Sequence, residues 1–263
     1  MSQVPGRPPH PPPRIGCAGW SIASRDAALF EDGASMLARY ATRFDLVEIN
    51  SSFYRPHRRT TYERWAASLP AGFRFSAKLP RTITHEHRLR GCGPLLDAFL
   101  EAATGLGERL GCLLVQLPPS LAFDARSAAT FLAMLRRRWA GGLACEVRHA
   151  SWLTLRAEAL LQRHGVARVA ADPARHGADA RPGGDPALAY WRWHGTPQIY
   201  RSAYDAAALD SLAAAIAMHP ASDHWVVFDN TAAGHATGNA AALQDRLQAG
   251  PATDAGPRAR RGK

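Results

Sequence analysis

Short apolar segments alternate with amphipathic segments along almost the whole chain, and this alternation limits the possible folds most strongly. A regular succession of strand and helix is typical of parallel α/β sheets. The expected strands cover 14–19, 45–50, 73–79, 112–117, 143–148, 167–172, 189–195 and 224–230. The expected helices cover 34–43, 60–69, 94–110, 125–139, 153–164, 205–218 and 236–247.

This succession predicts a single parallel (β/α)8 TIM-like barrel over residues 14–249, with an open doubly wound sheet as the alternative. Residues 173–187 show no helical pattern, so we expect one helix to be missing between the sixth and seventh strands. The proline-rich residues 1–13 and the polar, basic residues 250–263 are expected to be disordered tails.

Polar side chains recur on one face of the expected strands, near their carboxyl ends. In the second strand, for example, Glu48 and Asn50 alternate with Val47 and Ile49. A buried charge is costly unless it is paired or faces a wet cavity. In a barrel one face of each strand points inward, and the carboxyl-end rim is where barrel enzymes build their sites. This inner or rim set contains Glu48, Asn50, Lys78, Gln116, Glu146, Arg148, Asp172, Arg192, His194, Asp229 and Asn230.

Several longer motifs resemble the YecE-like family, domain of unknown function 72. The motifs are GCAGWS (16–21), VEINSSFYR (47–55), FRFSAKLPRTITHEHRL (73–89), LGCLLVQLPPS (110–120), EVRHASW (146–152), YWRWHG (190–195) and FDNTAAGHATGNA (228–240). The resemblance implies a barrel fold and does not imply a reaction. Asp229 departs from the family pattern, in which two asparagines are frequent at this place.

The inward charges are nearly balanced, which suits an anionic substrate, because arginine binds carboxylate or phosphate and a carboxylate can act as a base. We therefore expect an enzyme that acts by acid–base chemistry on a small polar or anionic metabolite. Glu146 is the expected acid–base residue, and Glu48, Lys78 and His194 are further catalytic candidates. The substrate-binding candidates are Asn50, Tyr54, His85, Gln116, Arg148, Trp152, Asp172, Arg192, Asp229 and Asn230.

Several of these roles have alternatives. Arg148 and Arg192 could form a fork for an anion, or Glu48 and Glu146 could neutralise both in a closed ring of ion pairs. Glu146 could equally be a structural partner of Arg148. Lys78 could form a Schiff base, but neighbouring carboxylates would keep its amine charged, which favours a fixed cation that pairs with Glu48 or binds substrate.

Aromatic residues that follow the strands are expected to wall the pocket, with Trp152 shielding Glu146 and Phe53 and Tyr54 at its mouth. No cofactor is expected, because the chain lacks G-x-G-x-x-G, Walker and nucleophile-elbow motifs. A divalent-metal-dependent hydrolase is an alternative that the nearby arginines oppose.

A nucleic-acid or protein-binding barrel without catalysis is a second alternative. The net charge is +10, but the tails contribute 1 + 3 of it and the body 10 − 4 = +6, without a basic stripe interleaved with aromatics. No apolar run approaches the roughly 20 residues that span a bilayer, and residues 1–14 have no secretory apolar region. Together with four scattered cysteines, this predicts a cytoplasmic protein with reduced thiols and no membrane partner. The sequence gives no indication of the oligomeric state.

Overall fold

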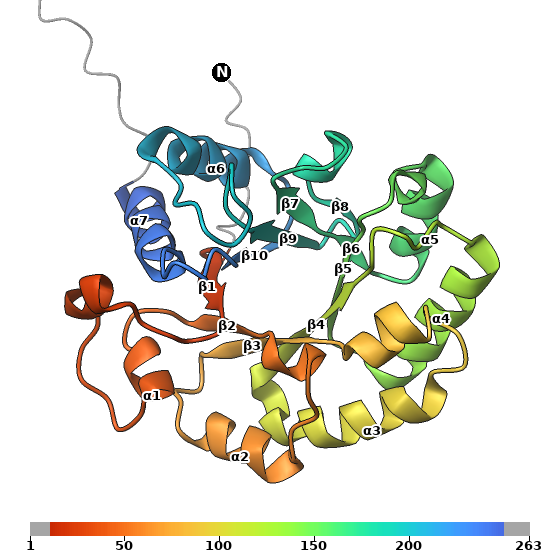
Figure 1. Cartoon of the computed structure of the whole chain (residues 1–263), viewed down its shortest axis with the longest axis horizontal. Helices are drawn as coiled ribbons and strands as arrows, with labels where there is room; N and C mark the ends of the chain where they lie inside the picture. The colour runs from red at the N-terminus through yellow and green to blue at the C-terminus, as the bar shows by residue number, and fades with distance from the viewer. Residues whose placement is uncertain (1–10, 250–263) are drawn as a thin grey trace, which may run out of the picture.

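A computed structural model describes residues 11–249, so the predictions for residues 1–10 and 250–263 lie outside the described residues. Ten strands form one sheet at the centre, and the helices surround it (Figure 1). The strands are β1 Arg14–Ala18, β2 Leu46–Ile49, β3 Arg74–Lys78, β4 Leu110–Gln116, β5 Gly142–Glu146, β6 Ala167–Arg168, β7 Ala170–Asp172, β8 Gly183–Gly184, β9 Leu188–Trp193 and β10 Asp223–Phe228.

The sheet is nearly closed. Its strand order is β7-β9-β10-β1-β2-β3-β4-β5-β6-β8, and only Val169 separates β7, at one end of the order, from β6, the last strand but one at the other end. The neighbouring strands are parallel except β6 and β8, which pair antiparallel. The predicted α/β class and the barrel-like parallel sheet are therefore confirmed.

Seven α-helices lie within the described residues, close to the predicted positions. They are α1 Met36–Tyr40, α2 Arg59–Ala67, α3 Gly93–Ala103, α4 Ala125–Arg138, α5 Leu155–Arg163, α6 Ala206–Met218 and α7 Ala236–Ala249. Side-chain oxygens cap four of them by accepting from a backbone N–H three residues later, as helix N-termini require: Ser35, Asp124, Thr154 and Asp205. None of the helices in residues 11–249 is long and apolar enough to cross a membrane.

Two elements differ from a regular βα repeat. Residues 173–187 contain a three-residue 3-10 turn, Ala178–Ala180, and β8, but no α-helix, as the sequence predicts. The helix expected over 94–110 is shorter, because α3 ends at Ala103 and a 3-10 turn follows to Arg109. Gly107, with φ 58° and ψ −140°, cannot continue a helix, although the apolar pattern runs on through buried Leu106.

The strands bury an apolar layer on each face. The outer layer packs against the helices and contains alternate strand residues such as Val47, Phe75 and Val115. The inner layer fills the amino-terminal half of the barrel and contains Leu46, Cys112, Leu114, Ala144, Ala167, Val169, Leu188, Tyr190, Trp225 and Val227. A Cβ at Gly111 would lie 2.6 Å from the Trp225 ring, so this glycine makes room for the indole that closes the barrel. Polar side chains inside the barrel therefore lie in its carboxyl-terminal half.

Candidate functional site

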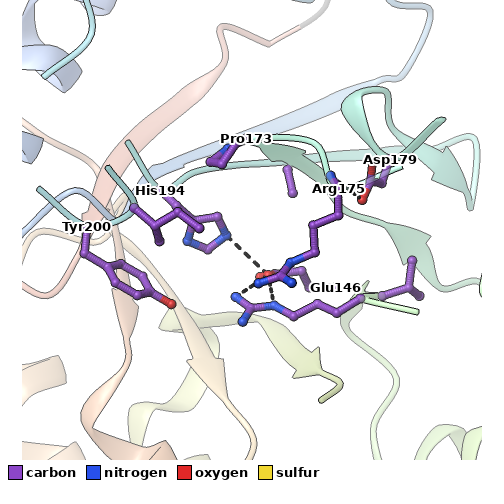
Figure 2. A pocket seen from close by; sticks show the side chains of 10 residues that line it. Glu146, Pro173, Arg175, Asp179, His194 and Tyr200 are labelled. Carbon is purple, nitrogen blue, oxygen red and sulfur yellow. Dashed lines mark hydrogen bonds and ion pairs between the residues drawn. The ribbon is translucent and has the colours of Figure 1, made fainter. Parts of the chain in front are cut away.

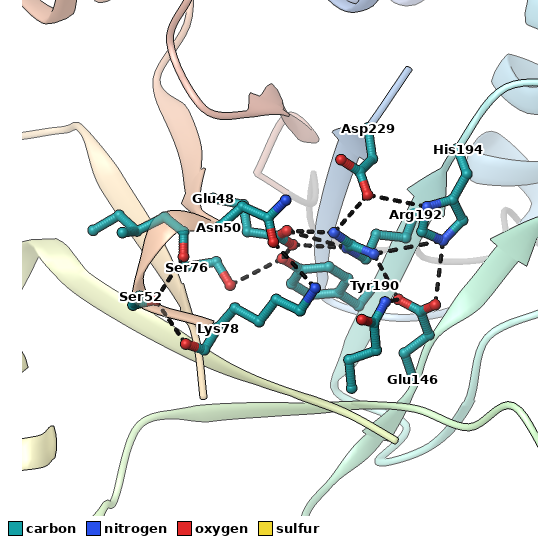
Figure 3. A network of polar contacts seen from close by, with 12 residues as sticks. Glu48, Asn50, Ser52, Ser76, Lys78, Glu146, Tyr190, Arg192, His194 and Asp229 are labelled. Carbon is teal, nitrogen blue, oxygen red and sulfur yellow. Dashed lines mark hydrogen bonds and ion pairs between the residues drawn. The ribbon is translucent and has the colours of Figure 1, made fainter. Parts of the chain in front are cut away.

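Arg192 lies at the centre of the polar half of the barrel and is fully buried (Figure 3). Its Nη2 donates to Glu48 Oε1 at 2.6 Å and to Asp229 Oδ2 at 2.9 Å, and its Nε donates to Glu48 Oε2 at 2.9 Å. Its Nη1 donates to Glu146 Oε2 at 2.7 Å. Burial opposes the charge of Arg192, but Glu48, Asp229 and Glu146 outweigh it and raise the arginine pKa well above its ordinary value. The guanidinium therefore links β9 to β2, to β5 and to the residue that follows β10, and it has no free face for a ligand.

One hydroxyl group, that of Tyr190, adds a further hydrogen bond to Glu48. The Tyr190 hydroxyl donates to Glu48 Oε2 at 2.9 Å and lies 2.9 Å from Ser76 Oγ. Glu48 thus accepts from both Arg192 and Tyr190, and it is completely buried. A buried carboxylate with these partners has a structural role in the barrel.

Glu146 accepts from four side chains. Gln116 Nε2 donates to its Oε2 at 3.0 Å and Arg148 Nε to its Oε1 at 2.8 Å, besides the contact with Arg192. His194 Nε2 lies 3.2 Å from Oε1. Burial alone would raise the pKa of Glu146, but Arg148, Arg192 and His194 hold it well below its usual value. Glu146 consequently stays ionised at neutral pH, which makes it a poor proton carrier.

His194 bridges two of these carboxylates. Its Nδ1 lies 3.1 Å from Asp229 Oδ2 and its Nε2 faces Glu146. Burial lowers the pKa of His194, but the two carboxylates outweigh burial and raise the pKa above 6.5. The imidazolium form satisfies both acceptors, so His194 and Arg192 together neutralise much of the carboxylate charge.

Lys78 is the cation of this region that has no ion pair among the described residues. Its Nζ donates to Asn50 Oδ1 at 3.1 Å and lies 4.1 Å from the centre of the Phe53 ring. Burial and the charge of Arg192 lower the lysine pKa to about 8, despite the opposing effect of Glu48, Glu146 and Asp229. Of the two roles expected for Lys78, the ion pair with Glu48 is not found among the described residues, because Arg192 on β9 pairs with Glu48 instead.

A cavity of about 410 Å³ opens above this network. Lys78, Arg81 and Arg148 bring positive charge to it, and His85, Gln116 and Tyr200 add neutral polar groups. Among the described residues that line it, Asp229 is the one carboxylate. Burial, then Lys78 and Arg148, lower the pKa of His85, so this imidazole is neutral at pH 7. The positive side chains in the wall of this cavity favour the binding of an anion.

A second cavity, of about 290 Å³, shares Arg148 and Tyr200 with the first, and Figure 2 shows Tyr200 in its wall. Glu146, His194, Arg175 and Asp179 are among its lining residues, and in the view of Figure 2 the Arg175 side chain extends towards Glu146. Because Arg148 and Tyr200 line both spaces, they separate the two cavities.

Most of the predicted site residues meet at this rim, including Tyr54, which is 71% exposed at the mouth. Trp152 does not. Its Nε1 donates to the Leu121 carbonyl at 3.0 Å, and its ring packs against Phe123. Trp152 therefore covers the chain after β4 and does not shield Glu146.

Asp172 and Asn230 hold the loop after β9 and do not line the larger cavity. Asp172 Oδ1 accepts from Thr196 Oγ1 at 2.6 Å and from the Tyr204 hydroxyl at 2.7 Å. Asn230 Nδ2 donates to the Ser202 carbonyl oxygen in this loop at 3.0 Å and to Asn239 Oδ1 in α7 at 2.9 Å. Both residues support the loop that carries Tyr200.

Three residues of the site were not predicted. Tyr190 has the same strand parity as Arg192, so the alternation that identified Arg192 could also have identified it. Arg81 and Tyr200 lie outside the strands, where no periodicity reveals which way a side chain points.

Within residues 11–249, no group of three or more His, Cys, Asp or Glu is placed to hold a metal ion. The carboxylates of Glu48, Glu146 and Asp229 are instead arranged around the guanidinium of Arg192.

Comparison with known proteins identifies a family. A family model described as "Protein of unknown function DUF72" matches residues 14–261. The chain is 33% identical to "UPF0759 protein YecE" of Escherichia coli (strain K12) over 148 residues, 53% of each protein. It is 27% identical to "UPF0759 protein YunF" of Bacillus subtilis (strain 168) over 150 residues, 53% of this chain and 52% of that protein. The matches span about half the length of these curated relatives.

Two solved structures share the fold. A DUF72 family protein from Enterococcus faecalis V583 superposes with a TM-score of 0.74 at 22% identity, covering 91% of this chain and 99% of that chain. A DUF72 family protein from Thermotoga maritima MSB8 gives a TM-score of 0.72 at 22% identity, covering 89% of this chain and 98% of that chain. At this level of identity the likeness concerns the fold alone.

Proposed function

The chain belongs to the DUF72 family, as its motifs predict, and we propose that it binds a small anionic metabolite in the larger rim cavity and transforms it by acid–base chemistry. The observation that carries this proposal is the charge of the cavity wall. Lys78, Arg81 and Arg148 face the space, whereas the carboxylates near it are engaged with Arg192, Arg148 and His194. The cavity is therefore more positive than the balanced charges of the sequence suggest.

This geometry changes the expected division of roles. Arg192 belongs to the closed ring of ion pairs and does not form an anion fork with Arg148. Arg148 is paired with Glu146 through Nε and Nη2, but its side chain keeps 17% exposure and lines both cavities. We assign anion binding to Arg81, Arg148 and Lys78, and proton transfer to Lys78 and His85.

The proposal includes a complete (β/α)8 barrel, in which β6 and β7 are two parts of the sixth strand and residues 173–187 replace one helix. The separation of β6 and β7 by Val169 alone supports it. The proposal also includes a cytoplasmic location, with which four buried, free cysteines agree. The metal-dependent hydrolase and the non-catalytic nucleic-acid or protein-binding barrel stay as alternatives.

Anion binding can be tested by calorimetry with inorganic phosphate, with pyruvate and with acetone, the neutral analogue of pyruvate. We expect phosphate or pyruvate to bind and acetone not to bind. Arg81→Gln should weaken anion binding roughly tenfold, because a hydrogen bond to a charged group contributes about 1.5–3 kcal/mol. Arg81 is half exposed and makes one 3.4 Å ion pair with Glu86, so its loss should leave the fold unchanged.

Arg137→Gln is the matched control, because it removes one positive charge from an exposed position at the end of α4. Equal weakening of anion binding in both variants would mean that binding depends on net charge alone, which would refute binding of the anion in the cavity. Absence of any anion binding would refute it as well.

A further inference from the structure

Lys78 has an environment that a simple anion-binding lysine does not need. It is the last residue of β3. Its side chain is buried, and its Nζ reaches the wall of the larger cavity. Among the described residues Nζ has one hydrogen-bond partner, Asn50 Oδ1. The Phe53 ring covers another side of the amine. These contacts fix the nitrogen and leave it open to a ligand in the cavity.

From this geometry we propose that Lys78 is a nucleophile that forms an imine with the carbonyl group of an anionic aldehyde or ketone. The inference rests on the proposed function and names its substrate class. Arg81 and Arg148 would bind the carboxylate or phosphate of the substrate while its carbonyl carbon lies against Nζ. Substrates of this class include 2-oxo acids and phosphorylated aldehydes.

The charges around Lys78 permit this reaction. Sequence considerations disfavour a Schiff base, because the nearby carboxylates would hold the amine charged. In the structure Arg192 engages Glu48, Glu146 and Asp229, and no carboxylate pairs with Lys78 among the described residues. With a pKa of about 8, roughly one lysine in ten is the free amine at pH 7, against roughly one in three thousand at the ordinary value of 10.5.

The step needs no oxidant or reductant. The Nζ lone pair attacks the carbonyl carbon, a C–N bond forms, and one proton moves from nitrogen to oxygen to give a neutral carbinolamine. The C–O bond then breaks as the hydroxyl takes a proton from solvent and leaves as water, and nitrogen keeps its second proton in the protonated imine. His85 and Tyr200 line the same cavity, and the neutral imidazole of His85 can carry these protons. The protonated imine would acidify the neighbouring C–H bond and so supply the acid–base chemistry of the proposed function.

The composition of the chain leaves few amines that can react in the test. Lys78 and Lys263 are its only lysines, so the α-amino group is the one other amine that can react. The whole protein is incubated with pyruvate or glyoxylate, reduced with sodium borohydride, and mapped by peptide mass spectrometry. We expect the secondary amine at Lys78, at a rate that rises with pH and levels off above about pH 8. Lys263 serves as the internal comparison, and its labelling should still rise towards the ordinary lysine pKa near 10.4.

Lys78→Arg keeps the positive charge and removes the nucleophile, so it should abolish the adduct while pyruvate still binds in calorimetry. If this variant fails to fold, peptide mapping of the wild-type protein still tests the proposal. Equal labelling of Lys78 and Lys263, or pyruvate binding without any adduct, would overturn the imine and leave the proposed function standing. Absence of both binding and adduct would refute both. Labelling by acetone as fast as by pyruvate would refute the anionic substrate class.

Discussion

At the scale of single residues, Arg192 explains why three carboxylates can share the inside of one barrel. Its planar guanidinium offers five N–H donors, enough for Glu48, Glu146 and Asp229 together. A lysine would provide three donors from one atom and could not span the same distance. Removal of Arg192 would leave three buried carboxylates without their shared cation, so Arg192→Met is expected to unfold the protein.

Glu146→Gln distinguishes a scaffold residue from an acid–base catalyst. We expect the variant to lose about 3–5 kcal/mol of unfolding free energy, because Arg148, Arg192 and His194 lose a buried charged partner. The lowered pKa means that Glu146 stabilises the fold above its unfolded-state pKa, and that this contribution disappears as pH falls through the folded-state pKa. The variant should therefore lose less stability on acidification than the wild type. Denaturant unfolding at several pH values measures both effects.

Glu63→Gln is the control, since it removes an exposed partner of Arg59 and should cost less than about 1 kcal/mol. A Glu146→Gln protein as stable as this control would restore Glu146 as a candidate catalyst.

Lys78 should reduce stability at neutral pH. Its pKa is about 8 in the folded protein and about 10.5 when unfolded, so the folded state binds fewer protons between these values and stability rises with pH there. Below pH 8 Lys78 is protonated in both the folded and the unfolded protein, so the whole free-energy cost of burying its charge is present. Lys78→Met should therefore gain about 1–3 kcal/mol at pH 7, and the gain should vanish near pH 10.5. Lys263→Met should show no such dependence, and a gain that persists unchanged at pH 11 would contradict the assignment.

At the scale of secondary-structure elements, the strands were predictable because their side chains alternate with a period of two. This parity identified Glu48, Lys78, Gln116 and Arg192 as members of one inner face. It could not identify partners, because Glu48 and Arg192 are 144 residues apart and meet across the barrel. Local adjacency suggested Lys78 as the partner of Glu48 instead. Loop residues such as Tyr200 follow no period and escaped prediction.

The loop between β9 and α6 gives a prediction at this scale. Gly195 has φ +100°, and a Cβ there would lie 2.9 Å from the Ser202 carbonyl oxygen and 3.1 Å from Asn230 Cβ. Gly195→Ala should therefore cost about 1–3 kcal/mol through backbone strain. It should also weaken anion binding, because the loop carries Tyr200 at the cavity wall. Gly72→Ala, where nothing lies within 4 Å of the added carbon, is the control. Equal melting temperatures for the two variants would show that the loop relaxes freely.

At the scale of the whole molecule, the larger cavity and Ala249, the last described residue, lie at opposite ends of the barrel. The cavity lies at the carboxyl ends of the strands. Near the end of α7, Asp245 pairs with Arg43 at 2.7 Å, and Arg43 precedes the start of β2. The chain therefore reaches Ala249 on the amino-terminal side of the sheet. A strand of five residues is about 16 Å long, which exceeds the screening length of about 8 Å at physiological salt.

Deletion of residues 250–263 consequently separates the proposed small-anion site from a nucleic-acid surface. The deletion removes a net charge of +3. If the ligand binds in the rim cavity, its affinity in 0.15 M salt should change less than about twofold, because the deletion leaves the charges of Lys78, Arg81 and Arg148 in the cavity wall unchanged. If the protein instead binds a phosphate backbone through its basic segment, affinity for DNA or RNA should fall and the slope of its salt dependence should decrease by about 3. Calorimetry with phosphate and a salt titration with a mixed-sequence oligonucleotide distinguish the two. Loss of phosphate binding on truncation would show that the basic segment, and not the cavity, holds the anion.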